Sequence, residues 1–241
     1  MSEPYFRTDP YLSDAPAQVT AHTPEGGVIV DRPLFYPTGG GQPGDSGHLT
    51  WAGGALQIAT TVKGKDKATD IVLVPAAPEA LPPVGTAVQQ RLDWGRRHRL
   101  MRMHTGLHLL SVVIPLPVSG GAVGEARSRL DFDMPDAPED RDTLEALLNR
   151  MIDDDLPISE RWITDADLAA NPGLVKTMSV APPRNAGRIR LIQIGDGDDM
   201  VDLQPCGGTH VARTGEIGHL RLGKIEKKGR QNRRVYLHLD T

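Results

Sequence analysis

The pattern of apolar and polar positions divides the chain into a strand-rich first part and a mixed second part. From Gln18 to about Asp93, short runs rich in β-branched residues are separated by turns that contain glycine and proline, which is the pattern of β-strands. The runs "QVTAH" and "VIV" flank Pro24-Glu25-Gly26-Gly27, which predicts a hairpin. About six short strands in this span predict a small β-barrel.

Helical spacing of apolar residues begins near Arg96. A stripe formed by Leu100, Met103, Leu107 and Leu110 continues until Pro115 ends it, and a second stripe runs from Leu144 to Ile152. Asp142-Thr143 suits the N-cap of this second helix, and "TDADLAAN" predicts a short third one.

Strand-like alternation returns in "GRIRLIQIG", "GHLRLGKIE" and "RRVYLHLD". The second part therefore mixes helices and strands. The sequence predicts an α+β chain, with a small β-barrel over residues 1–93 and an α+β domain over residues 94–241.

Composition narrows the class of protein. No stretch reaches the roughly 18 apolar residues that a membrane-spanning helix needs, and the first ten residues, "MSEPYFRTDP", do not have the pattern of a secretory signal. The single cysteine, Cys206, cannot form a disulfide within the chain. We expect a soluble cytoplasmic protein with no membrane partner.

The charge is unevenly distributed. The net charge of -4 argues against indiscriminate binding of nucleic acid, DNA included, yet two basic runs stand out. One run contributes Arg96, Arg97, Arg99 and Arg102, and the other contributes Lys227, Lys228, Arg230, Arg233 and Arg234. A single basic run is most simply explained as a solvent-exposed face of the protein with no binding role. Two runs, each near a histidine motif, favour a local phosphate-binding surface.

Two pairs of residues have the spacing of metal ligands. His104 and His108 are four apart on the first predicted helix, so both imidazoles lie on one face about one turn apart, which suits two ligands of a tetrahedral Zn²⁺. Thr105 occupies the position of the glutamate in an H-E-x-x-H metalloprotease, which excludes that class. Cys206 and His210 are also four apart, in "CGGTH".

Each member of the second pair also has a simpler interpretation. A free cysteine usually packs as a small buried apolar residue, and a histidine in a loop usually makes ordinary hydrogen bonds. Gly207 and Gly208, however, allow the chain to turn tightly around an ion. Taken together, three imidazoles and one thiolate form a donor set that Zn²⁺ prefers over Mg²⁺ or Ca²⁺. Spacing alone does not show that the two pairs meet, so for each pair the simpler interpretation stays open at this point.

These motifs resemble the editing domain of alanyl-tRNA synthetases, the freestanding AlaX trans-editing proteins and the second additional domain of threonyl-tRNA synthetases. The resemblance is carried by "HTGLHLL" followed by "CGGTHVARTGEIG", and it extends to the glycine-rich "FYPTGGGQPGDSG" and to "LDWGRRHRLMR". It covers nearly the whole chain and indicates a freestanding AlaX protein of the longer type. It also implies one Zn²⁺ per chain, held by His104, His108, Cys206 and His210.

The resemblance also implies a role for the glycine-rich run. A P-loop has Lys-Ser/Thr after its last glycine, but this run has Asp45-Ser46, so by itself it is most simply a structural turn. The resemblance implies instead that it helps to select the amino acid, through Gly39, Gly40, Gly41 and Gln42. Synthetase-embedded versions often have Thr directly before the second histidine, whereas Leu107 stands here. Recognition of a serine hydroxyl would then come from Thr105 or from the glycine-rich run.

The implied reaction is hydrolysis of the ester between serine and the acceptor end of alanine tRNA, with glycine as a second amino acid. Thr105, Asp202 and Thr209 are candidates for orienting water or substrate, and the two basic runs are candidates for binding tRNA phosphates. Two alternatives stay open. The protein could remove serine from threonine tRNA, or it could be a non-catalytic tRNA-binding module that zinc stabilises.

Overall fold

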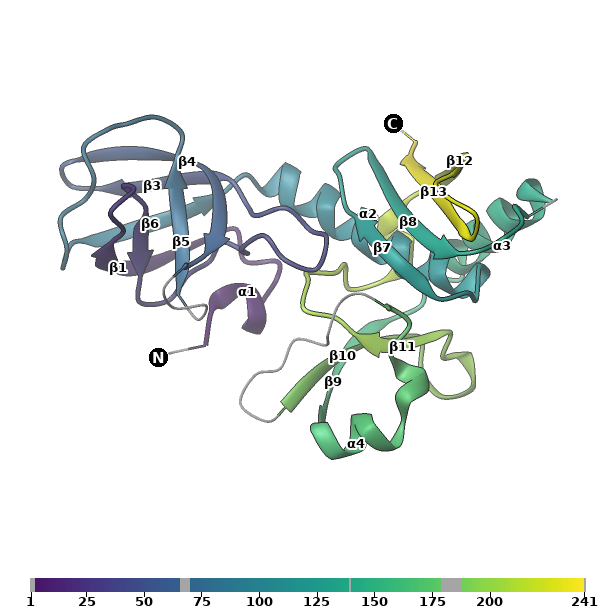
Figure 1. Cartoon of the computed structure of the whole chain (residues 1–241). Helices are drawn as coiled ribbons and strands as arrows, with labels where there is room; N and C mark the ends of the chain where they lie inside the picture. Colours follow the sequence, from purple (N-terminus) through teal and green to yellow (C-terminus); the bar gives the residue numbers. More distant parts are fainter. Residues whose placement is uncertain (1–2, 66–69, 139, 179–187, 241) are drawn as a thin grey trace. The chain divides into compact units, whose positions relative to one another are not determined.

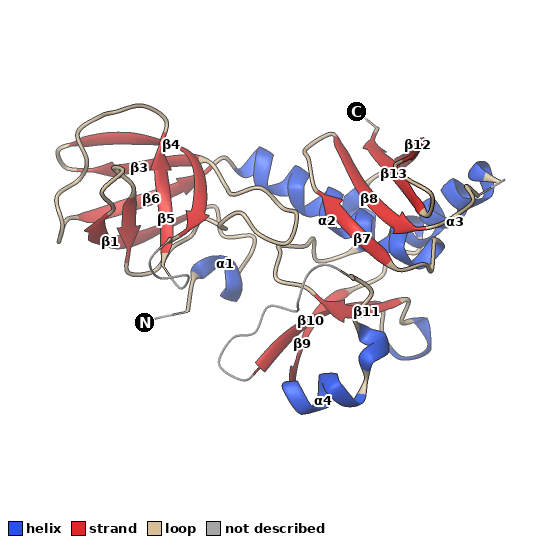
Figure 2. Ribbon diagram, viewed as in Figure 1, coloured by secondary structure: helices blue, strands red, loops and turns tan. Residues whose placement is uncertain are grey.

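The computed structural model describes residues 3–65, 70–138, 140–178 and 188–240. By its contacts the chain divides into two compact units, Met1–His98 and Arg99–Thr241. Figure 1 shows the elements of both units, and Figure 2 distinguishes strands from helices. The predicted fold class is confirmed, because a small barrel is followed by an α+β unit. Among the described residues, no helix combines the length and apolar character needed to cross a membrane.

The first unit is a closed antiparallel barrel. A short helix, α1 (Tyr5–Thr8), precedes its strands, which are β1 (Asp14–His22), β2 (Val28–Val30), β3 (Gly47–Trp51), β4 (Gly54–Lys63), β5 (Ile71–Pro75) and β6 (Ala87–Leu92). They close in the order β1-β2-β5-β4-β3-β6. Alternate residues point inward, including Val19, Leu49 and Leu73, and they form a fully buried core.

The glycine-rich run forms a tight hairpin turn in this unit. Gly39 and Gln42 exchange two backbone hydrogen bonds of 3.0 Å each. Gly40 and Gly41 occupy the two central positions with φ of 58° and 82°, which is the type I′ geometry that strongly favours glycine. The simple structural interpretation of this run is therefore correct for the backbone, and Gly41 at its tip is exposed.

A buried ion pair anchors the end of the glycine-rich run. The Arg97 guanidinium is completely buried and binds both carboxylate oxygens of Asp45, with its Nε 3.0 and 2.9 Å from them. It also donates to the carbonyl oxygens of Pro10 and Leu34, at 2.8 and 3.1 Å. Arg97 was expected to bind tRNA phosphates. That expectation is wrong, because its guanidinium donates into the first unit and is shielded from solvent.

The second unit contains two sheets around the second part of the long helix α2 (Trp94–Val113). One sheet has the order β12-β13-β8-β7, with β7 (Val118–Ala122), β8 (Arg127–Asp133), β12 (Leu220–Lys227) and β13 (Asn232–Leu239). The other has the order β11-β10-β9, with β9 (Ile158–Thr164), β10 (Arg188–Ile194) and β11 (Asp202–Pro205). The remaining helices are α3 (Arg141–Asp153) and α4 (Asp165–Ala170), with 3₁₀ turns at Pro172–Leu174, Gly197–Asp199 and Thr214–Ile217.

Helix α2 is buried on all sides over residues 103–111, rather than along one stripe. Gly106 explains how closely it packs, since a Cβ there would lie 2.7 Å from Leu220 Cδ1 and 3.3 Å from Leu237 Cδ2. Thus β12 and β13 contact one side of the helix. An all-round buried helix is central to its domain, and His104 and His108 are consequently shielded from water.

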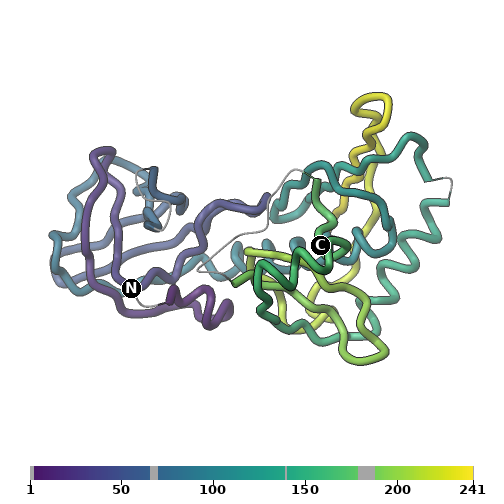
Figure 3. The backbone as a smooth tube through the Cα atoms, turned by 60° about the horizontal axis from the view of Figure 1, so that its bottom comes forward, coloured from purple at the N-terminus to yellow at the C-terminus, as the bar shows by residue number. Residues whose placement is uncertain are grey.

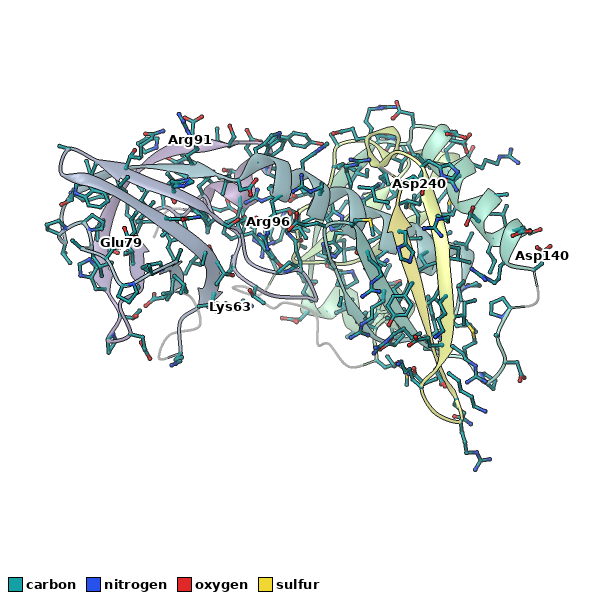
Figure 4. All side chains as sticks on the ribbon, turned by 90° about the horizontal axis from the view of Figure 1, so that it is seen from above. Lys63, Glu79, Arg91, Arg96, Asp140 and Asp240 are labelled. Atoms are coloured by element: carbon teal, nitrogen blue, oxygen red, sulfur yellow. The ribbon has the colours of Figure 1, made fainter. Side chains whose placement is uncertain are left out.

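Helix α3 begins slightly earlier than predicted. Its N-cap is Asp140, labelled in Figure 4, whose side chain accepts a hydrogen bond of 2.9 Å from the Thr143 N–H. Asp142 instead lies in the first turn of the helix, where its negative charge is favourable. The predicted short helix is present as α4, with a complete capping box between Thr164 and Asp167.

The Arg97–Asp45 pair gives a stability prediction for the first unit. Arg97→Met leaves a buried carboxylate without its cation, so we expect a loss of about 3–5 kcal/mol in unfolding free energy. Arg99→Met is the matched control from the same helix, because Arg99 pairs with Glu125 at 2.7 Å in an exposed position and should cost less than about 1 kcal/mol. Denaturant unfolding followed by tryptophan fluorescence measures both, and equal losses would contradict this interpretation.

Candidate metal centre

Helix α2 and the turn that follows β11 bring together the two pairs of residues predicted from the sequence. One donor atom from each of His104, His108, Cys206 and His210 lies within 4.8 Å of the others. The Cys206 Sγ is 3.6 Å from His104 Nε2 and 3.2 Å from His210 Nε2. The ring centroids of His108 and His210 are 4.6 Å apart. His108 and Cys206, although distant in the sequence, thus face the same small volume.

The dimensions of the cluster fit a tetrahedral ion. Zinc bonds of about 2.3 Å to sulfur and about 2.05 Å to nitrogen, at the tetrahedral angle, separate the two donor atoms by about 3.6 Å. The Sγ–Nε2 distances of 3.6 and 3.2 Å are close to that value. The cluster is therefore compatible with a metal site, and its sulfur and nitrogen donors suit a transition metal better than Mg²⁺ or Ca²⁺.

Asp202 holds the imidazole of His108. Its Oδ2 lies 2.9 Å from His108 Nδ1 and accepts a hydrogen bond of 2.8 Å from Gln204 Nε2. Its Oδ1 accepts a hydrogen bond of 2.5 Å from Lys176 Nζ. With Nδ1 bonded to a carboxylate, Nε2 of His108 is left to face the cluster, which is the usual arrangement of a metal-ligating histidine. Asp202 therefore orients a candidate ligand, and both of its oxygens are engaged by protein groups.

Thr105 contacts the Nδ1 atom of His210, as Asp202 contacts the Nδ1 atom of His108. Its hydroxyl donates to the Met101 carbonyl at 2.9 Å and lies 3.1 Å from His210 Nδ1. Because the single hydroxyl proton goes to Met101, the oxygen accepts from His210 Nδ1–H. The Thr105 side chain is fully buried. Its hydroxyl proton is therefore not available to a serine hydroxyl. Thr209, which precedes His210 in the sequence, is also buried.

Burial and the neighbouring side chains shift the pKa values of His108, Cys206 and His210, and the direction of the shift differs between these residues. Burial raises the pKa of the Cys206 thiol, but His104 and His210 outweigh it and hold this pKa well below its usual value. Burial lowers the pKa of His210 to about 3. Burial also lowers the pKa of His108, but hydrogen bonds to Asp202 and Cys206 outweigh it and raise this pKa to about 9. The lowered pKa of Cys206 favours the thiolate, which is the form in which a cysteine binds a metal.

The residues predicted to contact tRNA fall into different environments. Arg233 is buried and donates to the carbonyl oxygens of Pro135, Gly229 and Asn232, so it is excluded from the phosphate contacts like Arg97. Arg234 is partly buried against Asp131, at 2.7 Å. Lys227, Lys228 and Arg230 are exposed, and they lie on the β12–β13 hairpin that projects from the second unit (Figure 3).

The first basic run is similarly divided. Arg96, labelled in Figure 4, donates to the Gly44 carbonyl at 2.8 Å. Arg99 pairs with Glu125, and Arg102 Nε donates to the Ile217 carbonyl at 2.8 Å. The Arg99 side chain is 45% exposed. These arginines therefore have structural partners, even where part of the side chain still reaches solvent.

The sequence interpretation missed three residues around the cluster: Lys176, Arg190 and Gln204. Lys176 and Gln204 bind Asp202, and nothing in their local sequence indicates it. Arg190 shares the period-2 register of Ile192 and Ile194, but Arg188 and Gln193 in the same strand are also polar, so the sequence does not single it out.

Comparisons with known proteins agree with this architecture. Residues 189–236 match the family described as the threonyl and alanyl tRNA synthetase second additional domain, so the second unit carries a domain of that class. An alanyl-tRNA editing protein AlaX-M of Methanosarcina acetivorans is 30% identical, with 99% of both chains covered. The corresponding protein of Methanosarcina mazei is 29% identical, with 99% of this chain and 97% of the relative covered. The chain belongs to the AlaX family of editing proteins, as the sequence motifs indicated.

The same chain also matches part of much longer proteins. An alanine–tRNA ligase of Pyrobaculum arsenaticum is 34% identical over 92% of this chain, but the match spans only 25% of the ligase. The chain therefore corresponds to about a quarter of that ligase and to nearly the full length of the AlaX-M relatives.

Direct metal binding tests the cluster. Cys206→Ser and His104→Ala each remove one donor, so we expect the affinity for Zn²⁺ or Co²⁺ to fall by more than the roughly 10–100-fold that removing an outer hydrogen-bond partner causes. His48→Ala, an exposed histidine on β3, is the control and should bind like the wild type. Competition with a chromophoric chelator measures each affinity. Wild-type affinity in Cys206→Ser would exclude this residue as a ligand.

Proposed function

We propose that the protein hydrolyses the ester bond between serine and the terminal adenosine of alanine tRNA, and that glycine on the same tRNA is a second substrate. One observation carries the proposal: the buried three-histidine, one-cysteine cluster occurs in a chain that matches alanyl-tRNA editing proteins over nearly their whole length. The partner is then a mischarged tRNA, engaged at its acceptor end, and the reaction takes place in the cytoplasm.

The need for such an enzyme follows from binding energetics. A pocket shaped for the methyl group of alanine rejects the additional hydroxyl of serine by only about 10²-fold. A second site that hydrogen-bonds the hydroxyl can discriminate by roughly 10⁴–10⁵, because alanine would leave buried polar groups without partners. Since the Thr105 proton is engaged by Met101, the glycine-rich run, with Gly39, Gly40, Gly41 and Gln42, is the remaining candidate for recognising the hydroxyl.

The donor set favours zinc as the metal, held by His104, His108, Cys206 and His210. When bound, zinc supplies Lewis-acid chemistry that polarises a carbonyl or acidifies water. Residues of the protein set the tautomers and the charge of the side chains that would bind the zinc. Asp202 fixes the tautomer of His108, Thr105 fixes that of His210, and the lowered pKa of Cys206 provides the thiolate.

Four protein donors also favour a second candidate function. A zinc ion with four protein ligands is normally structural, whereas a catalytic zinc keeps one position open. The chain could thus be a tRNA-binding module that the metal stabilises without hydrolysing the ester. Removal of serine from threonine tRNA is the other alternative, and the alanyl names of both kinds of relative make it the weaker one.

Deacylation assays separate these functions. Purified protein is given Ser-tRNA(Ala), Gly-tRNA(Ala), Ala-tRNA(Ala) and Ser-tRNA(Thr), with and without a chelator. We expect release of serine, and more slowly of glycine, from alanine tRNA, with the rate lost on chelation and restored by zinc. Hydrolysis of Ser-tRNA(Thr) alone would favour the threonine alternative. No release above buffer in metal-loaded protein would exclude the enzyme and leave the binding module.

The exposed β12–β13 hairpin is the proposed tRNA contact in the second unit. Phosphate binding releases counterions, so replacing Lys227, Lys228 and Arg230 by glutamine should weaken tRNA binding. The slope of log affinity against log salt should become shallower by about 0.7–0.9 for each phosphate that is no longer neutralised. The charge-preserving triple variant Lys227→Arg, Lys228→Arg, Arg230→Lys is the matched control and should bind normally. Binding is measured by filter retention over a salt series, and an unchanged slope in the glutamine variant would place the tRNA elsewhere.

A further inference from the structure

A buried arginine, Arg190, donates hydrogen bonds to the turn that carries Cys206 and His210. Arg190 lies on β10, directly beside the end of β11, and its side chain is 6% exposed. One nitrogen, Nη1, donates to two carbonyl oxygens of the turn, those of Cys206 at 3.0 Å and Gly208 at 2.8 Å. The backbone joins Arg190 to the turn as well, because the Cys206 N–H donates to the Arg190 carbonyl at 3.2 Å.

These contacts satisfy two backbone carbonyl groups of the turn. Strand β11 ends at Pro205, so the carbonyl groups that follow have left the sheet. A buried carbonyl without a donor is costly, and the guanidinium supplies donors in a rigid, planar arrangement. Binding two carbonyls at positions 206 and 208 with one nitrogen fixes the curvature of the turn between the two proposed ligands.

The Arg190 guanidinium has one further side-chain partner, Glu160. Its Nη2 donates to Glu160 Oε1 at 2.5 Å, which balances the charge. Its Nε is buried and has no hydrogen-bond partner among the residues that the structure describes.

We propose that Arg190 is a positioning residue of the metal centre, which holds the Cys206–His210 turn so that the Cys206 thiolate meets the two histidines of α2. The proposal rests on the metal centre and not on any tRNA chemistry. It is therefore tested by metal binding without tRNA, and it could fail while the deacylase function stands.

The chain offers matched variants. Arg190→Met removes the guanidinium but keeps a long side chain, and Arg190→Lys keeps the charge but lacks the planar fork. Glu160→Gln breaks the ion pair and leaves both carbonyl contacts in place. Arg233→Met is the control for a generally destabilising change, because Arg233 is also buried on backbone carbonyls but donates to carbonyls outside the turn.

The readout is the affinity for Co²⁺ together with its absorption spectrum, recorded on folded protein as judged by circular dichroism. The sulfur-to-cobalt charge-transfer band reports the bond to Cys206 alone, and the visible d–d bands report the geometry of the whole site. We expect Arg190→Met to weaken binding by about 10–100-fold, as removing an outer hydrogen-bond partner does, and to weaken the charge-transfer band relative to the d–d bands. Arg190→Lys should be intermediate, and Glu160→Gln and Arg233→Met should match the wild type.

Three outcomes would overturn the proposal. One is wild-type affinity and spectrum in Arg190→Met. Another is an equal loss of affinity in folded Arg233→Met, which would reduce Arg190 to general stability. If Arg190→Met does not fold, Arg190→Lys decides the question, and a wild-type spectrum in that variant would show that the double carbonyl contact does not position the turn.

Discussion

The burial of helix α2 is the constraint on which the site depends. His104 and His108 project from one side of that helix, but they meet Cys206 and His210 only because the helix is enclosed within the second unit. Gly106 lets it approach Leu220 and Leu237, and Asp202 on β11 reaches His108 from another side. The same packing removes the donors from water. A buried thiolate needs a compensating positive charge, which its imidazole neighbours supply in part and a divalent ion would supply in full.

Buried arginines recur where the backbone of this protein is irregular. The 26 glycines and 20 prolines of the chain favour turns, and buried carbonyl groups in turns need donors from outside the regular ladders. Arg97 binds the carbonyls of Pro10 and Leu34, Arg190 those of Cys206 and Gly208, and Arg233 those of Pro135 and Gly229. The five donors of arginine suit this task. A basic run is therefore partly a structural feature here, and only its exposed members are available to tRNA.

The sequence predicted features that depend on residues close together in the chain, but not the contacts between residues that are far apart in it. The barrel strands, α2 and the four-residue spacings of His104–His108 and Cys206–His210 follow from periodicity and short motifs. The meeting of the two pairs came from the family resemblance, because spacing alone does not bring such distant residues together. The roles of Thr105, Asp202 and Arg97 depend on partners far away in the sequence, so they became visible only in the fold. The N-cap of α3 was misplaced by two residues, since Asp140 and Asp142 both satisfy the local preference.

X-ray absorption at the zinc edge, on protein purified with zinc, addresses the central claim most directly. We expect one sulfur scatterer at about 2.3 Å and imidazole nitrogens at about 2.0–2.1 Å, with the sulfur contribution absent in Cys206→Ser. A coordination sphere of oxygen and nitrogen only, or a stoichiometry far below one metal per chain, would contradict a metal centre built from the helix and the turn.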